Sequence, residues 1–335
     1  MTLEQIQRRR MHGLYLSRGC DDIVTLSREL MGMHCWFHRN VVFSAIIRGA
    51  DITGWKDALT KTWLYRGTLH GVAFDDLPTL LALHSDNSYL AEYMGEDTLS
   101  AIADDVIALM EDGVFSRIEM RRIFADRYDQ KIIDIALSPW GGIFVQLARQ
   151  GRVAFRDMTS RDFDLIAAEP VHTQEDVLPE LLRRYFKAYG PATIADAAYF
   201  LGLVWKFDKK RFADINLDDL ARFEIGKDTY YYYDDKAEMA DIPEITLLSG
   251  FDPLIVSYVE RSAVLPAEYK KAVILSSGIC LPTIAVNGRV AGLWNIKKDE
   301  PVVTFFEQPE KRLEDAAYDM VCKIIRQTVS IIKAK

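Results

Sequence analysis

Trp63-Leu64-Tyr65-Arg66-Gly67-Thr68-Leu69-His70 is the stretch of the chain that says most about its fold. Side chains alternate between the two faces of a strand, so Arg66, Thr68 and His70 share one face. The opposite face then carries Trp63, Tyr65 and Leu69. We expect a strand from Trp63 to Phe74 that forms a sheet floor beneath a polar cleft. The alternative role for Arg66, Thr68 and His70 is to hold neighbouring loops by hydrogen bonds.

The composition is that of a globular protein with more than one domain. A chain of 335 residues exceeds what one hydrophobic core usually organises, and 49% hydrophobic with 27% charged residues argues against disorder. The polar, basic stretch Met1 to Arg10 is not followed by an apolar run, so we expect no secretory signal. No run approaches the roughly 20 apolar residues that span a bilayer. We expect a cytoplasmic, nucleoid-associated protein with no membrane contact.

The four cysteines do not form a recognisable metal or disulfide pattern. Cys20, Cys35, Cys280 and Cys322 are widely spaced and include no CxxC pair. We therefore expect reduced, mostly buried thiols and no cofactor.

The net charge of -8 argues against a protein that coats nucleic acid indiscriminately. It does not exclude DNA binding, because the basic residues are clustered. The clusters are Arg8 to Arg10; Arg183, Arg184 and Lys187; and Lys206, Lys209, Lys210 and Arg211. Each cluster could equally be a solvated helix face.

The order of elements predicts an α+β fold built from tandem winged-helix modules and a C-terminal β domain with a closing helix. Asp21 or Asp22 can cap the first-module helix that contains Ile23, Leu26 and Leu30. Helices are also expected over residues 41–47, from about 51, and from 75, with Pro78 in the first turn of the last one. We place the boundaries of the four parts at residues 1–95, 96–175, 176–238 and 239–335.

Residues 102–155 and 178–233 share an outline of three helices and a hairpin, as in a winged helix. In the first copy Ser116 and Glu119 have the spacing of a capping box, a helix covers 140–149, and a turn at 151 leads into a strand. In the second copy helices are expected over 178–189, over 193–201 with Thr193 as cap, and over 204–212. Its hairpin turns at residues 226–228.

The C-terminal part is predicted to be rich in strands. We expect strands over 245–248 and 272–275, and a hairpin in which 284–286 turns at Asn287-Gly288 into 290–296. Asn-Gly is a strong hairpin signal because both turn positions need positive φ. An amphipathic helix over 310–333 closes the chain.

Four motifs in order along the chain resemble the AlkZ/YcaQ-type winged-helix DNA glycosylase superfamily. They are residues 61–70 with 75–78; Tyr189-Gly190-Pro191-Ala192-Thr193; Gly250-Phe251-Asp252-Pro253 with Glu260-Arg261-Ser262; and residues 282–294. The resemblance covers nearly the full length. It implies tandem winged helices around a duplex-sized channel, and excision of alkylated purines and unhooking of DNA interstrand crosslinks.

The resemblance also points to a catalytic segment, in which this chain departs from the family. The family motif is Gln, an apolar residue, then Gln or Asp, after a Gly-apolar pair. Here Gly32-Met33 is followed by His34-Cys35-Trp36, so His34 and Trp36 take the two polar positions. A neutral imidazole can hold or deprotonate a water near pH 7, whereas an indole only donates a hydrogen bond. We expect Arg66 and His70 to contribute to the same chemistry.

His38 lies four residues after His34, so on a helix both rings would share one face. No third ligand is evident, and packing or capping roles are commoner for such a pair. We therefore predict no metal site.

Aromatic and basic residues supply the candidate DNA contacts. Trp36, Phe37 and Trp140 could stack on a base, although most aromatic residues belong to cores. In the run Tyr230 to Tyr233 alternate side chains face outward, and Tyr231 is the one we select. Lys227 at the hairpin turn and Arg289 beside the Asn-Gly turn are candidates for phosphate contact, together with Lys206, Lys209, Lys210 and Arg211.

Two functions of different classes follow, both for a monomeric protein acting on damaged double-stranded DNA. The first is a monofunctional glycosylase that hydrolyses the N-glycosidic bond of bulky alkylated purines or crosslinks. The second is a non-catalytic winged-helix protein, either a damage sensor or a transcriptional regulator. A third alternative is that the acidic balance has turned the winged helices towards protein partners.

Overall fold

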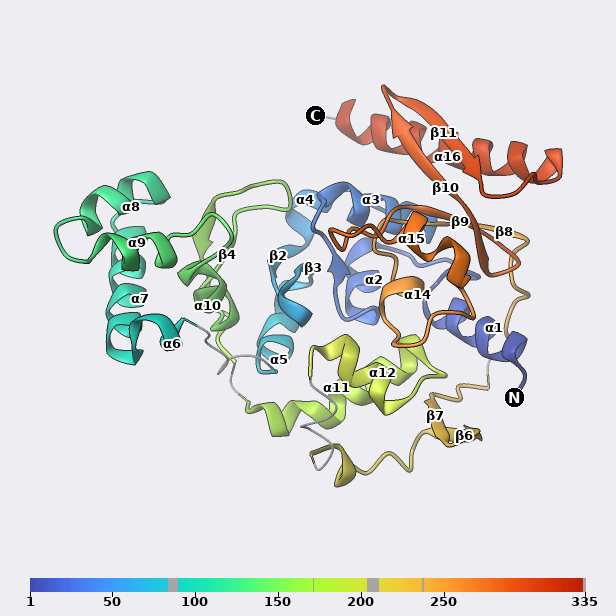
Figure 1. Cartoon of the computed structure of the whole chain (residues 1–335), viewed down its shortest axis with the longest axis horizontal. Helices are drawn as coiled ribbons and strands as arrows, with labels where there is room; N and C mark the ends of the chain where they lie inside the picture. Colours follow the sequence, from blue (N-terminus) through green and yellow to red (C-terminus); the bar gives the residue numbers. More distant parts are fainter. Residues whose placement is uncertain (84–89, 171, 204–210, 237, 334–335) are drawn as a thin grey trace. The chain divides into compact units, whose positions relative to one another are not determined.

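The computed structural model describes residues 1–83, 90–170, 172–203, 211–236 and 238–333. The chain forms two compact units (Figure 1). Unit 1 combines Met1–Trp55 with Pro179–Lys335, and unit 2 is the intervening Lys56–Leu178. Helices and sheets occur in both units, so the predicted α+β class is confirmed.

Unit 2 joins short helices to antiparallel strands. Its strands run in the order β3-β2-β4-β5. They are β2 (Thr60–Trp63), β3 (Leu69–Val72), β4 (Val153–Phe155) and β5 (Phe163–Leu165). Its helices are α5 (Leu77–Leu81), α6 (Ala91–Met94), α7 (Glu96–Glu111), α8 (Arg117–Phe124), α9 (Gln130–Ala136) and α10 (Ile143–Arg149). Pro78 lies in the first turn of α5, as predicted.

The core of unit 2 is mainly aliphatic and contains a cluster of aromatic rings. Phe144 and Phe163 stack with ring centroids 4.4 Å apart, and Trp63 lies 4.9 Å from Phe155 and 5.7 Å from Phe163. Trp63 is therefore a core residue.

The single strand predicted from Trp63 to Phe74 is wrong. β2 ends at Trp63, a 3-10 turn covers Tyr65–Gly67, and β3 begins at Leu69 and pairs antiparallel with β2. The reason is the Arg66-Gly67 pair, in which both residues have positive φ, 54° and 67°, and so reverse the chain. Arg66, Thr68 and His70 therefore do not line one face of a strand.

The N-terminal part of unit 1 is mainly helical. Its elements are α1 (Leu3–Gly13), α2 (Ile23–Glu29), β1 (Met33–His34) and α3 (His38–Ile47). The short helix α4 (Trp55–Ala58) begins at the last residue of this part, and its other residues belong to unit 2. Asp22 caps α2 by accepting hydrogen bonds from the backbone of Val24 and Thr25, as predicted. α4 is the short helix found where one was expected after Asp51.

The predicted second winged-helix copy is largely confirmed in its elements. α11 (Gln174–Tyr189) is followed by α12 (Ile194–Leu201), whose cap Thr193 forms a capping box with Asp196. The strands β6 (Ala221–Ile225) and β7 (Asp228–Tyr232) pair in register around the expected turn. The helix predicted over 204–212 lies mostly outside the described residues. In the first copy Ser116 is the N-cap of α8 but its side chain does not form the predicted cap hydrogen bond.

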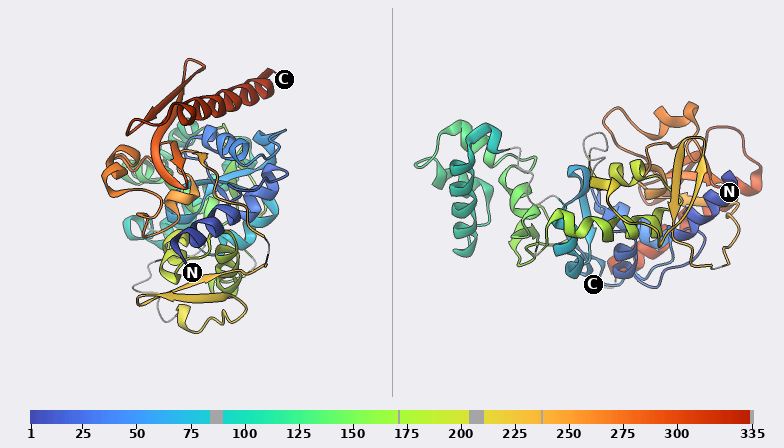
Figure 2. Two further views of the ribbon diagram at one scale, coloured as in Figure 1. Left: turned by 90° about the vertical axis from the view of Figure 1, so that its right-hand side faces the viewer. Right: turned by 90° about the horizontal axis from the view of Figure 1, so that it is seen from below.

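The C-terminal part of unit 1 contains a sheet of order β11-β10-β9-β8, covered by α16 (Figure 2). The strands are β8 (Ile245–Leu248), β9 (Thr283–Val286), β10 (Arg289–Lys297) and β11 (Glu300–Phe305), and the helix α16 covers Lys311–Lys333. Asn287 and Gly288 have φ of 48° and 77°, so the predicted Asn-Gly turn is confirmed. β11 was not predicted.

Short helical pieces connect β8 to β9. They are α14 (Pro253–Val256), a 3-10 turn (Ala267–Tyr269) and α15 (Lys270–Val273). The strand predicted over 272–275 is wrong, because residues 270–273 are helical and only Ile274 forms an isolated bridge, to Cys280. A short apolar run fits a buried helix end as well as a strand.

The division into four modules remains a prediction.

Candidate active site

The segment that carries His34 is a tight reversal between α2 and α3. Met31 and Gly32 both have positive φ, 57° and 105°, and the Gly32 N–H donates to the Ser27 carbonyl at 2.7 Å. This turn ends α2 and places His34 in β1. Because His38 is the first residue of α3, the expectation that His34 and His38 share a helix face is wrong. His38 stacks on Trp55 instead, with ring centroids 6.0 Å apart.

The half-buried His34 ring lies face to face on Phe251. The ring centroids are 4.0 Å apart and the planes are inclined by 11°. Phe251 itself has a φ of 57°, and its N–H donates to the Cys280 carbonyl at 3.2 Å. An unusual backbone conformation at a bulky residue must be held by its surroundings. The structure thus fixes a flat apolar surface against one face of the imidazole.

A buried ion pair follows directly after Phe251. Arg48, which ends α3, donates from Nη1 and Nη2 to the two carboxylate oxygens of Asp252, each at 3.1 Å, and both side chains are fully buried. Arg48 Nε also donates to the Leu14 carbonyl at 2.8 Å. Asp252 accepts further hydrogen bonds from the backbone N–H groups of Ser249 and Leu254. Removing either partner leaves a buried charge uncompensated, which is strongly destabilising.

Sequence reasoning missed this pair. Gly250-Phe251-Asp252-Pro253 was recognised only as part of a family resemblance. An Asp before a Pro at a helix start is a local capping signal, and Asp252 does accept the Leu254 N–H at 3.1 Å. The arginine partner lies 204 residues away and leaves no local signal.

Asn40 packs beneath the same turn. It is 4% exposed, and among the described residues its amide nitrogen has no hydrogen-bond partner. A Cβ on Gly250 would lie 3.0 Å from both terminal atoms of this amide. Gly250 therefore lets the Phe251 turn approach α3 closely.

α11 anchors the other side of the segment. Tyr189 Oη donates to the Leu30 carbonyl at 2.7 Å, and Arg184 donates to the Arg28 carbonyl at 3.0 Å. Lys187 forms an ion pair with Glu29 at 2.8 Å. These contacts fix the end of α2 immediately before His34.

Two exposed aromatic residues follow His34. Trp36 is 44% and Phe37 38% exposed, while Cys35 between His34 and Trp36 is buried. Arg39 is also exposed and lies over the Phe37 ring at 5.9 Å. This is a surface to which a flat apolar group or a nucleobase could bind.

Arg66 and His70, the other two predicted catalytic residues, belong to unit 2, whereas His34 and Trp36 belong to unit 1. His70 is 4% exposed, its Nδ1 is 3.1 Å from the Thr68 carbonyl oxygen, and its ring meets Tyr65 edge-on. Burial lowers the pKa of His70 to about 3, so its imidazole is neutral at physiological pH. Arg66 is the positive-φ residue of the turn. Their catalytic role remains a prediction.

The candidate DNA contacts are dispersed over unit 1. Lys227 is exposed at the turn between β6 and β7, and Arg289 is exposed at the start of β10. Tyr231 is half-buried: its backbone pairs with Ala192 and its ring lies 5.3 Å from that of Phe186. Arg211 is half-buried. Lys206, Lys209 and Lys210 lie outside the described residues.

Three further expectations concern absences and thiols. Within the described ranges, no group of three or more His, Cys, Asp or Glu side chains is arranged to hold a metal ion. In the same part of the chain no helix is both long and apolar enough to cross a membrane. All four cysteines are free thiols, and Cys20, Cys35 and Cys280 are buried, as predicted.

The family model described as DNA glycosylase AlkZ-like matches residues 56–320. A Streptomyces sahachiroi protein named interstrand DNA cross-link repair glycosylase is 27% identical over 278 residues, which are 76% of this chain and 75% of that protein. Among solved structures, Streptomyces sahachiroi DNA glycosylase AlkZ superposes with a TM-score of 0.78 over 97% of each chain, at 23% identity. The superposition shows a common fold.

Proposed function

Because the chain belongs to the AlkZ-like family of DNA glycosylases, we propose that it is a DNA repair glycosylase that hydrolyses the N-glycosidic bond of bulky alkylated purines in duplex DNA. Purines held in interstrand crosslinks are included in this proposal, because the similar Streptomyces sahachiroi protein is named for crosslink repair. The observation that carries the proposal is the family match over residues 56–320.

We assign the water-handling role to His34. Hydrolysis requires a positioned water and a group that takes its proton while positive charge develops on the sugar. The stacked Phe251 contacts one face of the imidazole, so the ring nitrogens lie at the edge of the stack. Nδ1 is buried, which makes Nε2 the atom proposed to accept the proton.

Trp36 takes a different role from the polar residue at its position in the family motif. Its indole offers a hydrogen-bond donor and no acceptor, so it does not activate water. With Phe37 it supplies an exposed aromatic surface that suits stacking on a purine or its adduct. The chemistry of base release therefore rests on His34 in this proposal.

The experiment is a base-release assay on duplex DNA that carries N7-alkylguanine or an alkyl crosslink. Abasic sites are cleaved with alkali, and bound DNA is measured in the same samples. We expect wild type and His34→Gln, which restores the family residue, to release the base. We expect His34→Ala to bind the duplex with nearly unchanged affinity and to release no base.

His38→Ala is the matched control, because His38 is an exposed histidine four residues away whose ring stacks on Trp55. It should retain full activity. Base release that persists in His34→Ala overturns the assigned role of His34. Duplex binding by the wild type without any strand break overturns the proposed activity and favours a damage sensor or regulator.

We propose further that a single chain suffices, acting in the cytoplasm at the nucleoid. A salt titration of duplex binding tests the DNA partner, because phosphate contacts make log affinity fall linearly with log salt concentration. Salt-insensitive binding, or no binding, would redirect attention to protein partners.

A further inference from the structure

A small crevice in unit 1 lies apart from the His34 segment. It has a volume of about 210 Å³ and is lined by the end of α1, the end of α11 and the residues after β7. Both basic and aromatic side chains line it. The ones that matter here are Arg9, His12, Tyr15, Arg18, Lys187 and Tyr232.

His12 is the first sign that the crevice takes a ligand. Both of its ring nitrogens are buried, and among the described residues neither has a hydrogen-bond partner. Burial, followed by the charge of Arg18, lowers the pKa of His12, so the ring is a neutral donor and acceptor. Buried polar atoms are normally satisfied by protein, water or a ligand.

Arg18 is the second sign. Its Nε donates to the His12 carbonyl at 2.9 Å and its guanidinium lies 4.1 Å from the centre of the Tyr15 ring. Within the described part of the chain it does not form an ion pair with a carboxylate. Tyr15 has a φ of 60°, a strained conformation for an aromatic residue. The Arg18 guanidinium is therefore a cation close to His12, whose imidazole has no hydrogen-bond partner among the described residues.

The other two cations are partly neutralised. Arg9 pairs with Asp234 at 3.2 Å, and Lys187 pairs with Glu29 at 2.8 Å. Asp235 adds a negative charge to the wall. Arg18 is therefore the cation most available to an anion.

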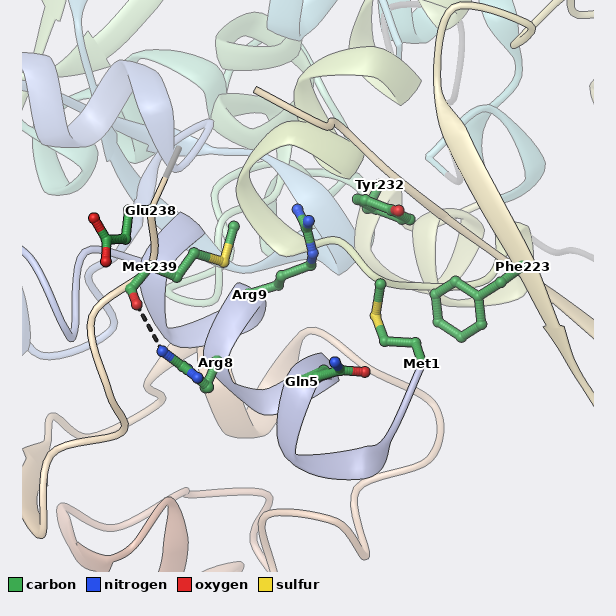
Figure 3. A pocket seen from close by; sticks show the side chains of 8 residues that line it. All are labelled: Met1, Gln5, Arg8, Arg9, Phe223, Tyr232, Glu238 and Met239. Atoms are coloured by element: carbon green, nitrogen blue, oxygen red, sulfur yellow. Dashed lines mark hydrogen bonds between the residues drawn. The ribbon is translucent and has the colours of Figure 1, made fainter. Parts of the chain in front are cut away.

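A second crevice, of about 500 Å³, shares Arg9, Tyr232 and Met239 with the first. Figure 3 shows Tyr232 and Phe223 on one side of it and the side chains of α1 on the other. The Arg9 guanidinium lies 4.4 Å from the centre of the Tyr232 ring at this shared boundary. The first crevice thus offers Arg18 and His12, and the second offers the rings of Phe223 and Tyr232.

We propose that these adjoining crevices bind one nucleotide, with its phosphate against Arg18 and His12 and its base against Tyr232 and Phe223. Arginine and imidazole N–H groups form charge-assisted hydrogen bonds with phosphate oxygens. Aromatic side chains stack on any base, because every base has a π face. A free mononucleotide and a nucleotide within a DNA strand present the same chemistry. The proposal does not depend on the glycosylase activity.

The test is calorimetric titration of the full-length protein with deoxyadenosine monophosphate, deoxyadenosine and inorganic phosphate. We expect saturable binding of the monophosphate and much weaker binding of the other two. Arg18→Gln and His12→Ala should each weaken binding of the monophosphate about tenfold or more, the usual effect of losing a hydrogen bond to a charged group. Circular dichroism establishes that each variant is folded.

Arg222→Gln is the matched control. Arg222 is an exposed arginine on β6, next to Phe223 and therefore on the opposite face of the strand. Its loss should leave the affinity for the monophosphate unchanged. If Arg222→Gln weakens binding as much as Arg18→Gln does, the interaction is a general charge effect and the proposal fails.

A single-stranded oligonucleotide distinguishes the two sources. Tighter, Arg18-dependent binding of the oligonucleotide supports the site and identifies a strand as the ligand. Tighter binding of the mononucleotide supports the site and identifies a free nucleotide. The proposal is overturned if inorganic phosphate binds as tightly as the mononucleotide and the oligonucleotide. It is also overturned if Arg18→Gln and His12→Ala change the affinity for neither of these two ligands.

Discussion

Acidification should destabilise unit 2 through a single buried histidine. Burial lowers the pKa of His70 from its ordinary value of 6.5 to about 3, so the folded protein keeps this imidazole neutral while the unfolded chain takes up a proton. The contribution of the neutral His70 to the free energy of unfolding is therefore complete above about pH 6.5, and it is lost as the pH falls from there towards 3. Between about pH 7 and pH 5 the proton uptake of the unfolded state lowers the free energy of unfolding by about 2 kcal/mol.

The assay is urea denaturation of wild type and His70→Asn at several pH values between about 5 and 7. Tryptophan fluorescence is a suitable signal, because Trp63 lies in the core of unit 2. The asparagine amide can still donate to the Thr68 carbonyl that His70 Nδ1 contacts, but it does not titrate. Wild type should lose about 2 kcal/mol more than His70→Asn over this range.

The control is His172→Asn, which removes an exposed histidine of the same unit and should leave the pH dependence unaltered. Equal pH dependence of wild type and His70→Asn would refute the reasoning. It would mean that the folded protein can protonate His70 without disrupting its surroundings.

Three further predictions concern stability and DNA affinity. Arg48→Met should lower the free energy of unfolding by about 3–5 kcal/mol, because it leaves the Asp252 carboxylate buried without its partner. A loss below about 1 kcal/mol in urea denaturation would contradict this. Gly142→Ala should lower the free energy of unfolding by at least about 2 kcal/mol, since φ is +55° and a Cβ would lie 2.1 Å from the Ala136 carbonyl oxygen. An unchanged midpoint of thermal unfolding would show that the loop adapts. Lys227→Gln should weaken duplex binding and lower the slope of log affinity against log salt by about one, and an unchanged slope would remove Lys227 from the interface.

Local signals in the sequence predicted many of the elements correctly. Asp22 and Thr193 are helix caps, Asn287-Gly288 is a hairpin turn, and α16 follows the apolar period of residues 310–333. Each of these signals acts through hydrogen bonds or φ preferences within a few residues. They depend little on the rest of the fold.

The errors arose where such a signal competed with a longer pattern. Residues 63–70 alternate as a strand does, but the positive φ of Arg66 and Gly67 turns them into a hairpin. Arginine is an uncommon residue in this conformation, so residues 63–70 contain no clear sequence signal for a turn. The apolar run ending at Leu275 was similarly ambiguous between strand and helix.

The candidate site was only half predictable. The resemblance identified the position of His34, and the sequence suggested exposed aromatics around Trp36. The stacking of Phe251 and the Arg48–Asp252 pair depend on contacts between the two separate segments of unit 1, which no spacing along the chain encodes. The state of the four thiols could be predicted without knowledge of such contacts, because burial is a general tendency of cysteine.

The division of unit 1 into two segments has a consequence for synthesis of the protein. Arg48 is translated 204 residues before Asp252, which at roughly 5–20 residues per second is a delay of about 10–40 s. Unit 2 is continuous in sequence and is complete well before that time. We expect it to fold first on the ribosome, which proteolysis of stalled chains of increasing length would reveal. Until Asp252 has been synthesised, Arg48 has no carboxylate partner and His34 has no Phe251 ring to stack on, so we expect the segment proposed to be catalytic to be among the last parts of the molecule to form.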